Sequence, residues 1–383
     1  MSDFRLPARL RGIEKSAIRK LFDAAPVGSI NLGLGEPDLP TPDVVRQAAA
    51  RVAIEEQNGY TTHAGLAQLR ELIAGEYPHK NLTADEVIVT AGSQEALYLA
   101  LMTLVEAGDE VLIPDPGFVA YETIVRMAGG TPVHYRLPAS ERFAFDADDF
   151  RRRVTKRTRA VICTSPSNPT GRTLSVEDLR LMAAALKDSD AYVISDEIYR
   201  EIYYTPERPQ SISEFHTRTL IVGGLSKSHS MTGWRLGWLC GEGQVVSAAL
   251  VLHGYVTTCA ATVSQKAAFA RWTPEGDAAC AAMRETFGRR RDHLLHLIES
   301  ELGLRSVAPD GAFYIMIEVK KHGTSARVAE KLLAARVITV PGSAFGAEGE
   351  GFLRVSFCAD ETVLTEGVRR IKEGLAEMKS NDK

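Results

Sequence analysis

The sequence predicts an α/β fold with two domains: a large domain with a mostly parallel seven-stranded sheet sandwiched by helices, and a smaller α+β domain formed from both termini. Three observations lead to this prediction. With 383 residues, the chain is long for a single domain. Between residues 82 and 241, short β-branched runs alternate with segments of helical periodicity. After Trp272 this alternation gives way to a long helical stretch.

Seven segments of the alternating region are expected to be strands, because each is a short apolar run rich in β-branched residues. In chain order they are residues 86–90, 110–113, 131–135, 160–164, 192–195, 220–223 and 236–240. Apolar stripes at helical spacing lie between some of them, one from Ala96 to Val105 and one from Leu179 to Leu186. This alternation favours a mostly parallel sheet, in which ligands gather at the carboxyl ends of the strands.

The remaining segments predict the smaller domain. Residues 275–300 are expected to form a long helix, followed by a helix at 326–335, strands at 337–340 and 352–357, and a final helix. The first forty or so residues are irregular and rich in Pro and Gly, and we expect them to pack with this region. The predicted divisions are an N-terminal arm with part of the small domain at 1–44, a large domain at 45–280 and a C-terminal small domain at 281–383.

Composition narrows the possible functions. The net charge of −4 gives no electrostatic reason to expect nucleic acid or a membrane surface as a partner. No secretory signal is visible, and no apolar stretch approaches membrane-spanning length. The five cysteines are scattered without a CxxC pair, which indicates reduced thiols and a cytoplasmic location. The nine histidines form no ligand-spaced cluster, so no metal site is predicted.

Lys227 is the most informative position. It follows an expected strand, is bracketed by small residues such as Ser226, and lies eight positions before Arg235. A lysine that attacks carbonyl groups needs an amine whose charge is suppressed by burial or cationic neighbours. Small neighbours leave room for a bulky adduct, and a guanidinium can hold a phosphate bidentately. The pattern is typical of a pyridoxal-phosphate Schiff-base site, although a lone Ser-Lys pair would sooner indicate a surface loop.

Two further signals lie where expected strands end. At Gly92 a strand turns tightly into a helix, whose first N–H groups, at Ser93 and Gln94, form an anion site. The same residues are equally compatible with an ordinary N-cap. Asp196 ends another strand, and Tyr199 follows in the same turn. A half-buried carboxylate needs a partner, which a pyridinium nitrogen would supply, with Tyr199 in reach of the ring phenolate oxygen. An aspartate capping the next helix is an equal alternative.

Three more positions carry chemistry of the same kind. Asn168 is held in a Pro- and Gly-rich turn after a strand, where its amide could donate to a ring oxygen or merely stabilise the turn. Phe118 follows a Pro-Gly turn and would be exposed unless it stacks on a flat group. Arg354 interrupts an apolar strand, so it either pairs with a buried acid or awaits a ligand carboxylate.

The order of these signals, beginning with Gly35 and Tyr60 and ending with Arg354, resembles the fold-type I pyridoxal-phosphate aminotransferases of class I/II over essentially the whole chain. The run from Ser226 to Arg235 and the Ser-Asn-Pro-Thr-Gly turn are highly specific to that family. The resemblance implies an enzyme that moves the α-amino group of an L-amino acid to a 2-oxo acid in two ping-pong half-reactions. It also implies a homodimer with shared active sites.

The resemblance implies a role for each catalytic position. Lys227 would carry the cofactor as an internal aldimine and move the proton between the substrate Cα and the cofactor C4′. Asp196 would pair with the pyridine nitrogen, while Asn168 and Tyr199 would bond the ring hydroxyl. Phe118 would stack on the ring.

The resemblance also implies positions that bind the phosphate and the substrate. Around the cofactor phosphate these are Ser93, Gln94 and Arg235, with Tyr60 contributed by a second subunit. Gly92 and Ser226 would also bind the cofactor. Arg354, Asn168 and the backbone at Gly35 would hold the substrate α-carboxylate.

The substrate is less defined. In bacterial aspartate aminotransferases of this kind a lysine often occupies the position of Gln94, so strict aspartate specificity is not expected. Residues 13–20, 224–235 and 258–260 resemble the N-acetyl-diaminopimelate aminotransferase branch. We expect glutamate and 2-oxoglutarate as one substrate pair, and aspartate, an aromatic amino acid or an N-acetyl-LL-diaminopimelate-like compound as the other donor.

Three other classes of function compete with an aminotransferase. A C–S β-lyase or an aminocyclopropane-carboxylate-synthase-like lyase shares the same lysine, aspartate and arginine set. A ligand sensor in a transcription regulator would need an N-terminal helix-turn-helix, for which the residues before Gly33 are too few. A nicotinamide-binding enzyme would need a GxGxxG turn, and Gly33-Leu34-Gly35 lacks the third glycine.

Overall fold

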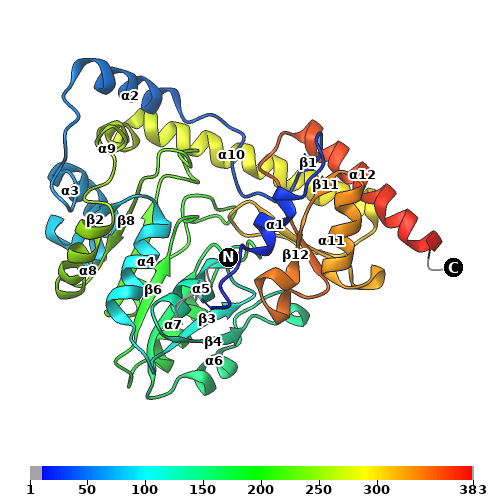
Figure 1. Ribbon diagram of the computed structural model, residues 1–383, viewed down its shortest axis with the longest axis horizontal. Coiled ribbons are helices and arrows are strands. Elements are labelled where there is room, and N and C mark those ends of the chain that lie inside the picture. The colour runs from blue at the N-terminus through cyan, green and yellow to red at the C-terminus, as the bar shows by residue number, and fades with distance from the viewer. Residues whose placement is uncertain (1–10, 382–383) are drawn as a thin grey trace, which may run out of the picture.

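The large sheet has seven strands in the spatial order β2-β8-β7-β6-β5-β3-β4 (Figure 1). The computed structural model describes residues 11–381. The strands are β2 (Val87–Thr90), β3 (Glu110–Asp115), β4 (Thr131–Arg136), β5 (Thr158–Thr164), β6 (Tyr192–Asp196), β7 (Thr219–Gly224) and β8 (Gly237–Cys240). β8 runs antiparallel to both of its neighbours, and the other adjacent pairs are parallel. The predicted mostly parallel seven-stranded sheet is therefore confirmed, with each strand end within two residues of its expected position.

Helices cover both faces of this sheet, which explains why its strands are continuously apolar rather than alternating. On β5, Ala160 and Ile162 pack against one face, with α4 (Ser93–Leu104), α5 (Ala120–Met127) and α8 (Gly243–Val256). Val161 and Cys163 face the other side, toward α6 (Ala147–Arg153) and α7 (Val176–Ala185). At the β2 end that second face is covered by α3 (Ala67–Gly75) and α9 (Thr262–Ala268).

The C-terminal part has its own antiparallel sheet and core. Its strands follow the order β12-β13-β10-β9, with β9 (Ser306–Val307), β10 (Tyr314–Glu318), β12 (Val340–Pro341) and β13 (Phe352–Ser356). The helices α10 (Pro274–Leu297), α11 (Ser325–Ala334) and α12 (Glu361–Asn381) pack on it around Phe287, Phe313 and Phe357. In Figure 1 the long helix α10 extends from the region of α9 to that of α12.

Two predicted elements of this part differ from the structure. The single strand expected at 337–340 is two short strands, because its halves pair with different partners. β11 (Val337–Ile338) pairs in parallel with β1 (Ile30–Asn31), whereas β12 pairs with β13. The long helix ends at Leu297 and is followed by a π-helical turn, Ile298–Leu302.

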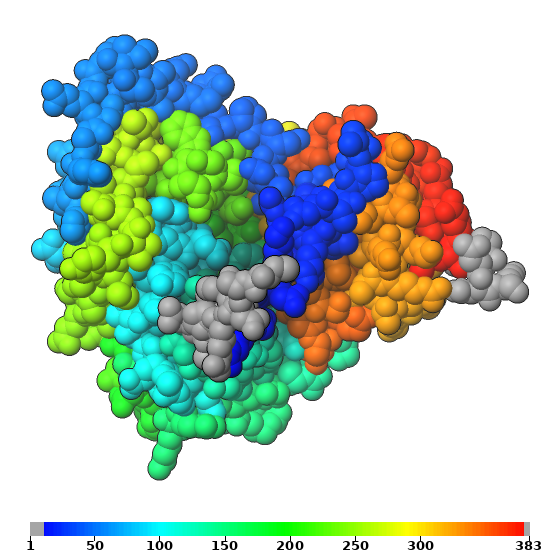
Figure 2. Space-filling model, in the orientation of Figure 1, coloured from blue at the N-terminus to red at the C-terminus, as the bar shows by residue number. Residues whose placement is uncertain are grey.

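The N-terminal segment crosses between the two parts. The pairing of β1 with β11 brings Leu32 into the C-terminal core. α1 (Ala17–Asp23) contacts β12, while α2 (Asp43–Glu55) packs on α9. In Figure 2 this segment, dark blue, lies across the face between the sheet region and the orange C-terminal region. No helix among residues 11–381 has the length and apolar character needed to span a membrane.

Candidate active site

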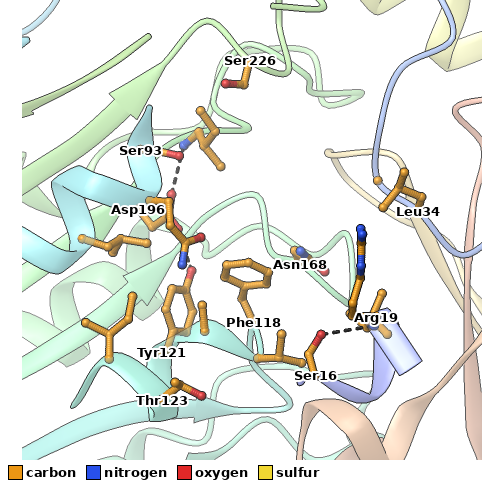
Figure 3. Close-up of a pocket in the computed structure, with 18 of the residues that line it drawn as sticks. Ser16, Arg19, Leu34, Ser93, Phe118, Tyr121, Thr123, Asn168, Asp196 and Ser226 are labelled. Carbon is orange, nitrogen blue, oxygen red and sulfur yellow. Dashed lines mark hydrogen bonds between the residues drawn. The ribbon is translucent and has the colours of Figure 1, made fainter. Parts of the chain in front are cut away.

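A cavity of about 630 Å³ lies at the carboxyl ends of the sheet strands, bounded also by β10, β13 and α1 (Figure 3). Eleven of the positions predicted from the sequence line it: Gly35, Ser93, Gln94, Phe118, Asn168, Asp196, Tyr199, Ser226, Lys227, Arg235 and Arg354. Gly92 lies directly behind this lining, and Tyr60 lies away from the cavity with 88% of its surface exposed. The topology thus brings together residues that are more than 300 positions apart in the sequence.

The start of α4 forms one end of the cavity. Gly92 precedes the helix with φ +88° and provides no capping side chain, and the first-turn N–H groups of Ser93 and Gln94 have no intrahelical acceptor. A Cβ on Gly92 would lie 2.6 Å from the Arg235 guanidinium, so glycine permits this close approach. Arg235 donates to the carbonyl oxygens of Ala91 at 3.2 Å and Thr232 at 3.0 Å. A helix N-terminus beside a fixed guanidinium suits a phosphate group.

Asp196 is buried at the end of β6. Its Oδ2 accepts a hydrogen bond from the Tyr121 hydroxyl at 2.7 Å, and its Oδ1 accepts one from the Ile198 N–H at 3.3 Å. Burial raises the pKa of Asp196 from 3.8 to about 6, and the two hydrogen bonds oppose this shift. The residues that follow form turns, so Asp196 does not cap a helix. A buried carboxylate with neutral partners is suited to a protonated ring nitrogen.

Lys227 follows β7 and points into the same cavity, where its Nζ donates to the Gly35 carbonyl at 2.8 Å. Burial lowers the pKa of Lys227 below its ordinary value, and Arg354 and Arg235 lower it further, against Cys358 and Glu36. More of the amine is therefore neutral and nucleophilic than on an exposed lysine. A surface-loop lysine would show neither feature.

Arg354 enters from β13 and is only 2% exposed. It donates to Asn168 Oδ1 at 2.8 Å and to the Gly33 carbonyl. The guanidinium lies over the rings of Tyr314 and Phe345, at 4.3 and 4.7 Å from their centroids. Its Nε is buried without a hydrogen-bond partner. Within residues 11–381 no carboxylate pairs with it, which leaves the second alternative from the sequence, a ligand carboxylate.

Two tyrosines of the site were not predicted. Tyr121 lies three residues after Phe118 at the start of α5, and that spacing beside a strand end was its only signal. Tyr314, on β10, bonds the Tyr199 hydroxyl at 2.8 Å. A Cβ on Gly35 would lie 1.7 Å from the Tyr314 hydroxyl, so the chain needs glycine there. No sequence pattern marks Tyr314, because its role depends on the approach of the two parts.

Comparisons with known proteins agree with this geometry. A family model described as aminotransferase class I and II matches residues 27–371. A Bacillus subtilis protein named as a probable N-acetyl-LL-diaminopimelate aminotransferase is 38% identical over 96% of this chain and 95% of its own length. The aromatic-amino-acid aminotransferase 2 of Thermococcus litoralis is 36% identical over 98% of this chain and 99% of its own.

A solved structure, the Thermus thermophilus aspartate aminotransferase with maleate, matches with a TM-score of 0.91 and 33% identity, covering 97% of this chain and 100% of that chain. These relatives support amino-group transfer rather than the lyase alternative. They also share the fold class predicted from the sequence. The chain belongs to the class I and II aminotransferase family, and it is a pyridoxal-phosphate-dependent aminotransferase.

Proposed function

We propose that the cavity handles glutamate and 2-oxoglutarate as one substrate pair, and aspartate, an aromatic amino acid or an N-acetyl-LL-diaminopimelate-like compound as the other donor. The observation that carries the proposal is Arg354, a buried guanidinium without an acidic partner among the described residues, lining the same cavity as Lys227. A buried cation of this kind is costly unless a ligand supplies the opposite charge. A substrate α-carboxylate would do so.

The residues present fit pyridoxal phosphate. The phosphate would bind at the start of α4, where Gly92 allows Arg235 to approach the N–H groups of Ser93 and Gln94, with Ser226 nearby in the lining. Asp196 would hold a protonated ring nitrogen, and Phe118 offers a flat apolar surface for the ring. When bound, the cofactor supplies an electron sink for the negative charge left at the substrate Cα.

The chain's own groups would bind and orient the substrate and move its proton. Arg354 would grip the α-carboxylate, with Asn168 and the Gly35 backbone beside it, so that the Cα–H bond faces Lys227. Lys227 would be the covalent attachment point, and its Nζ would accept and return the Cα proton, for which a lowered amine pKa is favourable. Asn168 Nδ2 and the Tyr199 hydroxyl would bond the ring hydroxyl, because Asn168 Oδ1 is already occupied by Arg354.

The test supplies one amino donor at a time and leaves out the 2-oxo acid that would accept the amino group. The purified holoenzyme is mixed with glutamate, aspartate, phenylalanine or N-acetyl-LL-diaminopimelate, and the 2-oxo acid product is quantified. We expect one equivalent of product per site and no ammonia, with the fastest donor identifying the second substrate. A Lys227→Ala variant is the control without covalent chemistry. Continuous release of ammonia and pyruvate from a β-substituted amino acid would contradict the proposal and favour the lyase alternative.

A homodimer with shared sites is part of the proposal. Tyr60 belongs to a segment that lies against α8, since a Cβ on Gly254 would be 2.8 Å from the His63 ring. On the same helix Val251, Tyr255 and Val256 are 61%, 91% and 56% exposed, and apolar side chains exposed together in this way mark interaction surfaces. A second subunit would cover these residues and receive Tyr60 at its phosphate end.

We also propose the domain division and compartment expected from the sequence. Residues 45–280 would be the large cofactor-binding domain, with the small domain formed by 1–44 and 281–383. The pairing of β1 with β11 supports this division. A cytoplasmic location is supported by the five cysteines, which are all free.

A further inference from the structure

Among the described residues, four cationic side chains line the cavity, and the proposed chemistry uses three of them. Lys227, Arg235 and Arg354 have the roles given above. The fourth is Arg19, which comes from α1 in the N-terminal segment. In Figure 3 its side chain rises from α1 toward the side of the cavity that Asn168 and Leu34 line. The cavity thus has a guanidinium on the wall formed by α1, Arg19, in addition to Arg354 on β13.

Arg19 is held only weakly in its present position. Its side chain is 72% exposed, and its Nε pairs with Asp23 at 3.2 Å within the same helix. Exposed ion pairs of this kind contribute little to stability. Asp23 has a second cation, because Lys15 Nζ lies 3.1 Å from its other oxygen. Arg19 can therefore leave Asp23 for a ligand without stranding an unpaired carboxylate.

Apart from Asp23, the described lining beside α1 offers Arg19 no unpaired acid. The only acid that α1 and its flank add to the described lining is Glu14, which is already paired with Lys20. Gln94, at the foot of the cavity, is neutral. The other lining residues near α1, Ile18 and Phe22, are apolar. An apolar wall with one guanidinium would accept an uncharged substrate side chain by contact and an anionic one by an ion pair.

We propose that Arg19 binds the distal carboxylate of a dicarboxylic substrate, such as glutamate or 2-oxoglutarate, and so determines specificity. The inference rests on the proposed function, because it takes Arg354 as the site of the α-carboxylate. Two guanidiniums on different walls of one cavity match a ligand with a carboxylate at each end. Aromatic and aliphatic amino acids would use Arg354 alone.

The test is binding of unreactive acids to the holoenzyme by isothermal titration calorimetry. Glutarate carries two carboxylates, and 3-phenylpropanoate carries one. We expect Arg19→Ala to raise the Kd for glutarate about tenfold, the effect of losing one charge-assisted contact at an exposed site, and to leave 3-phenylpropanoate unchanged. Arg289→Ala is the matched control, because Arg289 is also an exposed arginine paired within its own helix, with Glu285, but does not line the cavity. It should leave both Kd values unchanged.

The KM values should follow the same division, with that for glutamate raised in Arg19→Ala and that for phenylalanine unaffected. Equal weakening of both acids in Arg19→Ala, or of neither, would overturn the role of Arg19. Arg354→Ala separates this inference from the proposed function beneath it. If that variant bound both acids as well as the wild type, the α-carboxylate site itself would be wrong, whatever Arg19 does.

Discussion

Asp196, Lys227 and Arg354 are charged groups in one cavity, and neutral groups supply the hydrogen bonds that hold them. Asp196 is held by a tyrosine hydroxyl and a backbone N–H, Lys227 by a carbonyl, and Arg354 by an amide and a carbonyl. Within residues 11–381 none of the three forms an ion pair. Burying charge in this way costs stability, and the cost is recovered only when a ligand brings the opposite charge.

Asp196 should therefore make the cofactor-free protein less stable as the pH rises. Because its folded pKa of about 6 lies above the ordinary 3.8, the folded state holds the proton more tightly than the unfolded chain. Asp196 therefore contributes its full stabilisation below the unfolded-state pKa of 3.8, and this contribution is lost as the pH rises through the folded-state pKa of about 6. A difference of this size corresponds to at most about 3 kcal/mol.

Urea unfolding of the cofactor-free wild type and Asp196→Asn, at pH values below and above this window, measures the effect. We expect the variant to gain stability relative to the wild type as the pH rises, while an exposed control, Asp188→Asn, shows no such trend. If the difference in free energy of unfolding between Asp196→Asn and the wild type did not change with pH, the raised pKa of Asp196 in the folded state would be wrong.

Arg354→Ala should weaken the use of every amino acid, because each substrate carries the α-carboxylate that Arg354 would bind. The expected loss in kcat/KM is about 2–5 kcal/mol, as for a buried ionic contact. A primary amine without a carboxylate, such as phenethylamine, should be much less affected in the half-reaction. Equal losses for amines and amino acids would show that Arg354 acts through structure rather than through the carboxylate.

At the scale of elements, Glu95 stabilises the turn between β2 and α4 on the side away from the cavity. One carboxylate oxygen accepts from the Ala91 N–H, and the other accepts from Thr257 at 2.6 Å and is 2.9 Å from His253 Nδ1 on α8. The carbonyl oxygen of the same residue, Ala91, accepts a hydrogen bond from the Arg235 guanidinium. Glu95 thus positions the start of α4, the proposed phosphate site, without contacting the phosphate itself.

Glu95→Gln should lower cofactor affinity because the amide cannot accept all of these hydrogen bonds. A loss of about fivefold to tenfold is expected from one or two weakened bonds. Fluorescence titration of the cofactor-free protein with pyridoxal phosphate measures it, with Glu122→Gln, from an exposed pair with Arg126, as the control. The KM for the amino donor at saturating cofactor should stay unchanged; a shift there instead would place Glu95 in substrate binding.

The elements also show what the sequence could and could not predict. β5 and β6 were found because buried parallel strands are continuously apolar, and Asp196 and Lys227 because they follow such runs. The division of 337–340 between two sheets depends on β1, about 300 residues earlier, and leaves no local signal. The position of Arg19 at the cavity likewise depends on contacts between distant parts of the chain. From the sequence alone, a charged residue on a short exposed helix is expected to face solvent.

At the scale of the whole molecule, the site joins three distant stretches of chain. Gly35 comes from the N-terminal segment, Lys227 from the sheet and Arg354 from the C-terminal part. Gly92 lies directly behind the cavity lining, whereas Tyr60 lies away from the cavity of its own chain, which fits the proposed contribution from a second subunit.

Subunit mixing tests that contribution. Lys227→Ala should be inactive and Tyr60→Ala strongly impaired, each in both sites of its own dimer. If Tyr60 serves the partner, a mixed dimer has one intact site, and random assortment of equal amounts should restore about a quarter of the wild-type activity. Recovery is followed by the coupled assay after co-refolding, with sedimentation to verify the dimers. Dimers that form but recover no activity would rule out a shared site.

The position of α1 has a practical consequence for anyone preparing this enzyme. The proposed selectivity wall lies within residues 14–22, whereas α12 does not line the cavity. A tag, a linker or a proteolytic cut placed next to α1 can therefore change the apparent substrate preference of a protein that remains well folded. Activity profiles of preparations tagged next to α1 and next to α12 should be compared before the preferred amino donor is assigned.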